Sequence, residues 1–306
     1  MYFPNEEERK DLTRGLLPRA REMVVAEELR GWNWNVPPLE PIYDVRLALY
    51  EVAGYYCPTA RDLYMKRVQG VEVRPNIPMI FGKVLHDSVA KLITGAKRAI
   101  YIKGVDFASE ALEELREPDY SVLDRASSYL DGQELDELKN RIAIVWRHQL
   151  NALVSQVDVA LAKQPRIGVD SLVSLAIPVS VEHNLDGSFL GLSSHLSTDA
   201  YRFYDTAILD LKFGESMDFH RLTTTGYALV MESLYEYPVN LGCIIYARFD
   251  GGRLLIDKDY HLIDDELRQW FIEARDEKMR MVSEEIDPGM PGECYEGCPY
   301  MGHCSR

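Results

Sequence analysis

The stretch TAILDLKFG, residues 206–214, carries an aspartate and a lysine inside a run of apolar residues. Its aliphatic and β-branched content predicts a strand, in which Asp210 and Lys212, two positions apart, point to the same face. Charges in such a strand are costly unless they are paired or bind a metal ion. The same acid-x-lysine spacing recurs at Glu137 and Lys139, but there it lies in a polar helical stretch. Asp210 and Lys212 therefore form either a structural ion pair or part of a metal site whose lysine orients a water molecule.

A second acidic residue lies close by along the chain. The segment GLSSHLSTDAYRFY, residues 191–204, is predicted to form the neighbouring strand, with Asp199 at its end. A short turn through Asp205 then leads into the strand that holds Asp210. Two carboxylates on adjacent strands beside a lysine suit metal-assisted hydrolysis of a phosphodiester, in which the metal polarises the phosphate and helps to form hydroxide.

The N-terminal half of the chain is predicted to be helical. Apolar residues at three- and four-residue steps indicate a long amphipathic helix over 131–163, and residues 5–30 and 81–100 also have helical patterns. Between them, two short helices are expected to meet at Cys57, with Pro58 in the first turn of the second. His86 lies on the 81–100 helix. Neutral imidazole is a good Mn²⁺ ligand beside carboxylates, although a histidine on an apolar helix is commonly structural.

After Pro165 the pattern changes to strands and helices in a mixed order. The β-branched segment SLVSLAIPVSV, residues 171–181, is predicted to be a strand, and the Asp-Gly of residues 184–188 indicates a hairpin. Later strands are expected at 241–249 and 254–263, and later helices at 217–237 and 264–285. The predicted fold is α/β (α+β), with a mainly helical N-terminal portion packed against a mixed sheet flanked by helices.

Composition places the chain among ordinary folded proteins. It has 306 residues, of which 46% are apolar and 27% charged. No stretch approaches 18 uninterrupted apolar residues, and the acidic N-terminus lacks a signal-peptide pattern, so no membrane contact and an intracellular, cytoplasmic location are expected. The formal net charge of −15 argues mildly against a nucleic-acid partner. That argument is weak, because the local field at a groove matters more than the total charge.

Three of the five cysteines lie in the last stretch of the chain, ECYEGCPYMGHCSR. They are Cys294, Cys298 and Cys304, and the other two are Cys57 and Cys243. In an intracellular protein, clustered cysteines favour a metal or a cluster over disulfides. Four thiolates hold a [4Fe–4S] cluster, a [2Fe–2S] cluster or a structural Zn²⁺. Cys243 lies within an apolar strand and is predicted to be a core residue.

Taken in order, these features resemble the RecB-like branch of the PD-(D/E)xK nuclease superfamily. That family has Gly-x-x-x-His on a helix, matched here by Gly82 to His86, and then an aspartate after a strand, matched by Asp199. Its Asp-x-Lys matches residues 210–212. A following helix carries a tyrosine, which HRLTTTGYALVME supplies as Tyr227. One cysteine before the histidine and three after the last helix complete the family pattern.

The strongest resemblance is to the CRISPR-associated Cas-four-type iron–sulfur exonuclease family, in its longer type I-A branch. It covers roughly residues 45–306, and the segment YYCPTARDLYMKRV carries much of it. The resemblance implies a restriction-endonuclease-like PD-(D/E)xK core with a C-terminal iron–sulfur segment. The implied divisions are an N-terminal extension over 1–44, a helical part over 45–165, a catalytic core over 166–285 and a cluster-binding tail over 286–306 closed by Cys57.

The resemblance also assigns residues to a divalent-metal site. The ligands of Mn²⁺ or Mg²⁺ would be His86, Asp199, Asp210 and the backbone carbonyl of Leu211. Lys212 would position or activate the attacking water, and Tyr227 would orient the site or the DNA strand. Glu182, which we expect at the end of an earlier strand, would join through water.

All four framework cysteines would hold an iron–sulfur cluster, with [4Fe–4S] favoured and [2Fe–2S] as the alternative. Cys57 would be the ligand that the three tail cysteines lack. Two departures from the family pattern stand out. Thr223 replaces the family's glutamine, and the tail has three residues between its first two cysteines, where the commoner form has two.

The function implied is a metal-dependent DNA exonuclease that acts on single-stranded or overhanging ends. It would trim fragments before their installation as CRISPR spacers, with the spacer-integrase proteins as partners; self-association is left open. One alternative is a RecB-like nuclease for general DNA end processing or repair. A further alternative, if Thr223 marks a decayed site, is a catalytically impaired iron–sulfur DNA-binding subunit.

Overall fold

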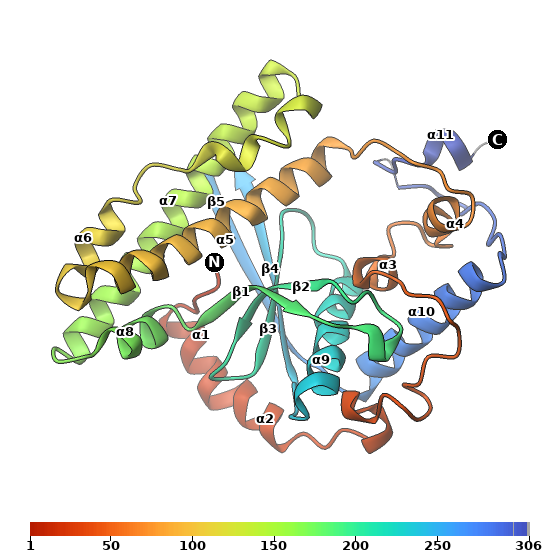
Figure 1. The fold of residues 1–306 in the computed structure, drawn as a ribbon, viewed down its shortest axis with the longest axis horizontal. Coiled ribbons are helices and arrows are strands. Elements are labelled where there is room, and N and C mark those ends of the chain that lie inside the picture. Colours follow the sequence, from red (N-terminus) through yellow and green to blue (C-terminus); the bar gives the residue numbers. More distant parts are fainter. Residues whose placement is uncertain (296, 305–306) are drawn as a thin grey trace.

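The computed structural model describes residues 1–295 and 297–304. It confirms a mixed sheet flanked by helices, with five strands in the order β1-β2-β3-β4-β5 (Figure 1). The strands β3 and β4 are parallel, and every other neighbouring pair is antiparallel. The bounds are Val179–Leu185 for β1, Leu196–Arg202 for β2, Ala207–Lys212 for β3, Leu241–Asp250 for β4 and Arg253–Leu262 for β5.

The connections explain this mixed topology. Helix α9, Arg221–Tyr235, lies between the parallel strands β3 and β4 in sequence, as a parallel pair requires a long crossover. A tight turn at Gly251 and Gly252 joins the antiparallel pair β4 and β5. The predicted Asp-Gly turn begins the connection between β1 and β2, which continues through a 3₁₀ turn over Ser188–Leu190.

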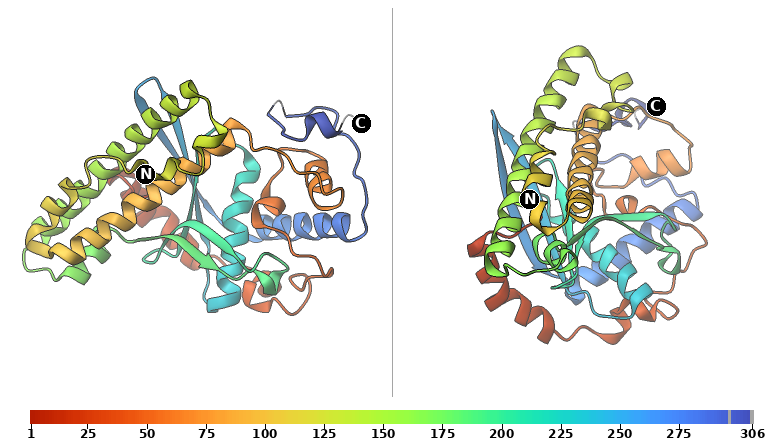
Figure 2. Two further views of the ribbon diagram at one scale, coloured as in Figure 1. Left: turned by 45° about the horizontal axis from the view of Figure 1, so that its top comes forward. Right: turned by 60° about the vertical axis from the view of Figure 1, so that its left-hand side comes forward.

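Two cores lie on the two faces of the sheet. Alternate residues of β3 belong to different cores, since Leu209 and Leu211 pack in the first and Ile208 packs in the second. Figure 2 shows the two groups of helices around the strands. The first core includes helices α5 (Ile77–Lys103), α6 (Ala108–Glu113), α7 (Gly132–Lys163) and α8 (Val169–Ala176), and the second includes α3 (Leu49–Ala53), α4 (Arg61–Arg67), α9 and α10 (Asp265–Ser283).

Helices α5 and α7 confirm two predicted helices and begin at capping residues. The side chain of Asn76 accepts a hydrogen bond from Met79 N at the start of α5. Asp131 and Glu134 form a capping box at the start of α7. These caps satisfy backbone N–H groups that the first helical turn leaves without a partner. The start of α5 is therefore fixed by local sequence, and the register that presents His86 follows from it.

Two predictions about helix and strand boundaries in the chain before β2 were wrong. The predicted strand over 171–181 is helix α8 as far as Ala176, and only its last part belongs to β1. Leu172, Val173 and Ala176 are buried at helical spacing, so the 3.6-residue period outweighed the β-branched composition. Pro58 does not begin a helix either, because Ala60 takes a left-handed conformation (φ 56°) and α4 starts only at Arg61.

The N-terminal segment contributes to both cores. Helices α1, Glu6–Asp11, and α2, Leu17–Glu22, flank a π-helical turn, so the predicted helix over 5–30 is confirmed only as far as residue 22. Residues 1–3 pack in the first core, whereas Leu29 and Leu39 pack in the second. The last element described is the short helix α11, Met301–Cys304 (Figure 1). No helix among the described residues is long and apolar enough to cross a membrane.

Candidate active site

Three acidic residues occupy neighbouring positions on adjacent strands: Glu182 on β1, Asp199 on β2 and Asp210 on β3. The pairing of Ala200 with Leu209 and of Tyr201 with Ile208 sets Asp199 beside Asp210 on the adjacent strand. Asp199 lies in the middle of β2, and the prediction that it ends the strand was wrong. Its Oδ2 accepts a hydrogen bond of 2.8 Å from the backbone N–H of Leu211. The sheet therefore holds this carboxylate against β3.

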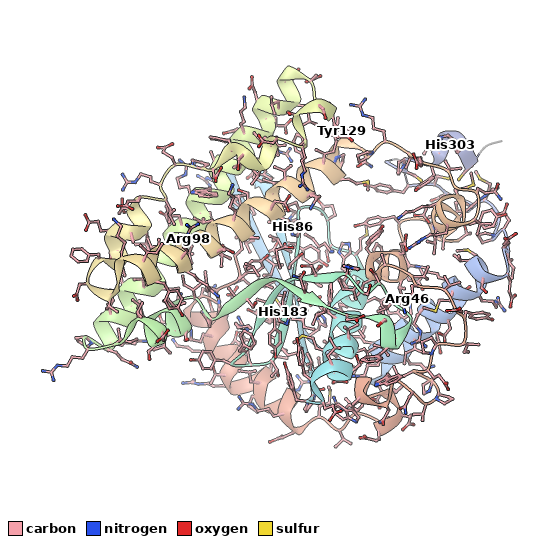
Figure 3. All side chains as sticks on the ribbon, viewed as in Figure 1. Arg46, His86, Arg98, Tyr129, His183 and His303 are labelled. Carbon is pink, nitrogen blue, oxygen red and sulfur yellow. The ribbon has the colours of Figure 1, made fainter. Side chains whose placement is uncertain are left out.

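His86 reaches the same carboxylate from helix α5. Its Nδ1 atom lies 3.3 Å from Asp199 Oδ2, and Figure 3 places His86 between α5 and the strands. Burial alone would lower the pKa of His86, but the charge of Asp199 and the hydrogen bond with it raise the pKa above its ordinary value. The structure thus brings together two residues more than a hundred positions apart, as the sequence predicted.

Asp210 is almost completely buried and incompletely satisfied. Lys212 Nζ stands 2.9 Å from Asp210 Oδ2 as an ion pair. Nevertheless, no donor in the described parts of the chain makes a well-aligned hydrogen bond to this oxygen. Burial raises the pKa of Asp210, and the charge of Asp199 adds to that rise, while Lys212 opposes it. A buried oxygen with spare acceptor capacity is what a metal ligand requires.

The charges of the four side chains compensate one another. Burial would raise the pKa of Asp199, but His86 and Lys212 lower it below its ordinary value. Burial would lower the pKa of Lys212, but Asp210 and Asp199 raise it. The lysine is therefore an ammonium at neutral pH, where it can donate hydrogen bonds to a water or to a phosphate oxygen.

Tyr227 and Glu182 are connected to the strand of Asp199 by hydrogen bonds through Ser197. Tyr227 Oη on α9 donates a hydrogen bond of 2.5 Å to Ser197 O, and Ser197 Oγ donates one of 3.0 Å to Glu182 Oε2. Glu182 has a left-handed backbone conformation (φ 48°) within β1, which is unusual for a strand residue. Glu182 lies in the middle of β1, so the prediction that it ends a strand was wrong. Thr223 lies one helical turn before Tyr227 on the same face of α9, where a threonine is shorter than the family's glutamine.

No sequence pattern indicated that Tyr2 belongs near this site. Tyr2 is buried, and its pKa is raised by burial and then by the charges of Asp199, Asp210 and Glu182. Tyr2 also belongs to the same core as Ala200 and Leu209, the neighbours in sequence of Asp199 and Asp210. The segment is held by Lys258, whose Nζ donates to Phe3 O at 2.8 Å. A contact between the start of the chain and strands near residue 200 leaves no local sequence pattern.

The candidate metal ligands of this site do not surround a common metal position in the part of the chain that the structure describes. Within residues 1–295 and 297–304, no three histidine, cysteine, aspartate or glutamate side chains stand close enough together to hold a metal ion as they are. The chemistry of the donors still fits Mn²⁺ or Mg²⁺, since carboxylate oxygens, a backbone carbonyl and an imidazole suit these ions. The incompletely bonded Oδ2 of Asp210 is the observation that supports this fit.

The four framework cysteines come from two separate segments that lie together. Burial raises the pKa of the Cys304 thiol, and the charges of Cys298, Cys57 and Cys294 raise it further. Burial likewise raises the pKa of Cys298, with Cys57 and Cys294 adding to the rise. The four thiols therefore act on one another through their charges, but no three of them, among the residues that the structure describes, stand close enough together to hold a metal ion as they are. Cys243 lies elsewhere, buried in β4, which confirms its prediction as a core residue.

Hydrogen bonds hold the tail against the Cys57 segment. Thr59 Oγ1 donates to Gly289 O at 3.0 Å, and Arg61 forms an ion pair of 3.0 Å with Asp287. Farther along, Asn76 Nδ2 donates to Gly297 O at 2.7 Å. These contacts bring the tail next to the loop after α3 and to the start of α5, which carries His86 farther along.

The fold and the site define an α/β protein with an acidic, lysine-containing centre in a mixed sheet and a separate group of four cysteines. Comparison with known proteins identifies its family. The sequence model of the family described as CRISPR-associated exonuclease Csa1 matches residues 1–306. The chain belongs to this family, which confirms the resemblance to a CRISPR-associated exonuclease family.

Two relatives bear the same name. The CRISPR-associated exonuclease Csa1 of Saccharolobus solfataricus is 31% identical over 281 residues, which cover 92% of this chain and 92% of the relative. The CRISPR-associated exonuclease Csa1 of Thermoproteus tenax is 30% identical over 280 residues, which cover 92% of this chain and 91% of the relative. The similarity therefore extends over almost the whole length of all three proteins.

Proposed function

We propose that this protein is a divalent-metal-dependent DNA exonuclease of the PD-(D/E)xK type, acting on single-stranded or overhanging ends. The observation that carries the proposal is the meeting of His86, Asp199, Asp210 and Lys212 in a protein of an exonuclease family. These residues come from one helix and two strands. An ion pair needed only for stability would not require the second carboxylate and the imidazole.

The residues have separable tasks in this proposal. His86, Asp199, Asp210 and the carbonyl of Leu211 would hold Mn²⁺ or Mg²⁺. When bound, the ion supplies Lewis-acid polarisation of the phosphate and lowers the pKa of water. Lys212 donates hydrogen bonds that orient the attacking water or stabilise charge on the phosphate, and Asp210 holds the lysine in place at 2.9 Å. Tyr227 fixes β2 by its hydrogen bond to Ser197 O and so positions Asp199.

We also propose that Cys57, Cys294, Cys298 and Cys304 bind an iron–sulfur cluster, with [4Fe–4S] favoured. Support comes from the mutual electrostatic influence of these thiols and from the hydrogen bonds that hold the tail to the Cys57 segment. The cluster would join the tail to the start of α5 and thereby stabilise the fold. Zn²⁺ is the competing occupant, and iron and sulfide analysis of anaerobically purified protein separates the two.

The biological step proposed is the trimming of DNA ends before new CRISPR spacers are installed. Both relatives carry CRISPR-associated exonuclease in their names, which favours this context over general DNA repair. The partners would then be single-stranded DNA and the spacer-integrase proteins. Co-purification of the protein with these integrase subunits, with and without a DNA end, tests the assignment.

The activity is tested with anaerobically purified protein, Mn²⁺ and single-stranded DNA labelled at either end. We expect stepwise shortening by the wild type and none by Asp210→Ala, with Asp136→Ala, an exposed aspartate on α7, as the control. Failure of cluster-loaded wild-type protein to cut would contradict the enzyme. Thr223 in place of the family glutamine would then favour an iron–sulfur DNA-binding subunit.

A further inference from the structure

An aromatic patch lies between the cysteine segments and the candidate active site. We use this name for Tyr56, Phe219 and Tyr295. The ring centroids of Tyr56 and Phe219 are 5.0 Å apart in an edge-to-face arrangement, and those of Tyr56 and Tyr295 are 5.6 Å apart. Tyr56 is 48% exposed and Tyr295 is 46% exposed, so both present ring surface to solvent. The patch thus combines mutual packing with free aromatic surface.

Buried hydrogen bonds fix the orientation of Tyr56. Its Oη atom lies 3.0 Å from His220 Nε2, and His220 Nδ1 lies 3.2 Å from Tyr246 Oη. Burial, followed by the charge of Lys212, lowers the pKa of His220 to about 4, so the ring is neutral at neutral pH. A neutral imidazole donates through one nitrogen and accepts through the other, which lets it bond both tyrosines at once. The exposed ring of Tyr56 is therefore held rigidly from beneath.

The same hydrogen bonds place the patch beside the active site. Tyr246 on β4 pairs in register with Lys212 on β3. The patch therefore adjoins the lysine that we propose acts on the phosphate.

We propose that the aromatic patch is a stacking platform for the nucleobases of a single-stranded DNA end, next to the phosphate to be cut. This inference rests on the proposed nuclease function. Each base has an apolar face that stacks on an aromatic ring whatever its sequence, which suits a sequence-tolerant exonuclease. A duplex keeps its bases stacked on one another, so the platform favours single-stranded ends.

The position of the patch also gives the cysteine group a role in substrate binding. Tyr56 directly precedes Cys57, and Tyr295 directly follows Cys294. The two exposed rings are therefore carried by the two segments that the proposed cluster would join. Binding of the cluster would hold the two segments, and with them the two rings, in a fixed relative position.

The test compares normal and abasic DNA ends for each protein variant. Fluorescence anisotropy would measure the affinity for single-stranded oligonucleotides of about 10 nucleotides, without divalent metal, with ordinary or abasic terminal nucleotides. Wild-type protein should bind the ordinary end about tenfold more tightly than the abasic end. Because the ratio is taken within one variant, a general loss of affinity or of folded protein cancels.

Three variants and a control isolate the stacking contribution. Tyr56→Leu and Tyr295→Leu should reduce the ratio toward one, whereas Tyr56→Phe keeps the ring and should retain most of it. Tyr101→Leu is the matched control, because this half-exposed tyrosine lies on α5 about 22 Å along the helix from His86. Its ratio should equal that of the wild type. Iron content is measured for each variant.

The outcomes separate this inference from the nuclease proposal. Wild-type protein that cuts DNA with Mn²⁺ but binds ordinary and abasic ends equally would overturn the stacking platform and leave the nuclease intact. The same conclusion holds if both leucine variants keep the wild-type ratio. Wild-type protein that neither binds nor cuts single-stranded DNA would overturn both proposals. A base-dependent ratio that falls in both leucine variants supports the platform.

Discussion

Two buried carboxylates in this molecule have opposite surroundings. Glu232 on α9 is fully buried, and its oxygens are bonded by Arg30 at 2.8 Å and Arg268 at 2.8 and 2.9 Å. The backbone N–H groups of Gly31 and Val239 also donate to it, each at 2.9 Å. Asp210, in contrast, is 4% exposed, and its Oδ2 has an ion pair with Lys212 but no well-aligned hydrogen bond from the described residues.

This difference separates a structural carboxylate from the one that we propose to be a metal ligand. Glu232 has two cationic partners and two backbone donors, so its charge is neutralised within the fold and it ties residues 30 and 31 to α9 and α10. Asp210 shares one lysine with Asp199, and its remaining acceptor capacity is left unused. Buried polar groups without partners are unfavourable for stability. Their retention is therefore understandable where a ligand completes the bonding.

The largest effect on stability should come from the saturated carboxylate. Glu232→Gln removes the negative charge between two buried arginines and leaves them without a counter-charge. Breaking a buried ion pair in this way typically costs about 3–5 kcal/mol of unfolding free energy. Urea denaturation measures the loss. Glu273→Gln, an exposed position on α10, should change stability by less than about 0.5 kcal/mol, and an equal effect of both variants would contradict the comparison.

The next largest effect should be on activity at the unsaturated carboxylate. Asp210→Asn keeps the shape but removes a proposed metal ligand, so cleavage should fall at least about a hundredfold. Tm should stay unchanged or rise, because a costly buried charge is removed. Parallel nuclease and thermal-melt measurements check both parts. A large drop in Tm together with retained activity would assign Asp210 to the same structural class as Glu232.

Divalent metal should distinguish the two carboxylates directly. At a hundred times its dissociation constant, Mn²⁺ should stabilise the wild type by about 2.7 kcal/mol. Calorimetry should show the same stabilisation by Mn²⁺ in Glu232→Gln, although this variant is less stable without metal. It should show no stabilisation by Mn²⁺ in Asp210→Asn. Stabilisation of the Asp210 variant by Mn²⁺ to the wild-type extent would place the metal elsewhere.

The smallest effect expected is in pH dependence without metal. Burial raises the pKa of Asp210, so the folded protein binds this proton more tightly than the unfolded chain. The corresponding stability is present at low pH and is lost as pH rises above the ordinary carboxyl range near 4 and through the raised pKa. The stability advantage of Asp210→Asn over the wild type should therefore grow from acid to neutral pH. A difference that shrinks over this range would mean that Lys212 outweighs burial.

Much of the fold follows from short-range sequence patterns. The helices α5 and α7 and the strands β2 to β5 were predicted because their apolar periodicity and turn residues are clear. Helix α8 was missed because its β-branched residues suggested a strand although their burial follows a helical period. Pro58 was misplaced because the left-handed turn at Ala60 is not encoded by a glycine.

The site was predicted only where a motif marked it. His86, Asp199, Asp210 and Lys212 were named from their order in the chain, and the structure brings them together. The positions of Tyr2 and of the network from Tyr56 to Tyr246 were not foreseen. They depend on contacts between segments far apart in sequence, which neither periodicity nor spacing encodes.

The central claim is that Asp199 and Asp210, the second of which has an incompletely bonded oxygen, form a metal site with His86. Crystals soaked in Mn²⁺ test it most directly through anomalous scattering measured near the manganese absorption edge. The account predicts a peak between the carboxylates of Asp199 and Asp210 and within reach of His86, and no such peak in Asp210→Asn. A wild-type protein that cuts DNA with Mn²⁺ but shows its manganese peak away from these residues would contradict the account.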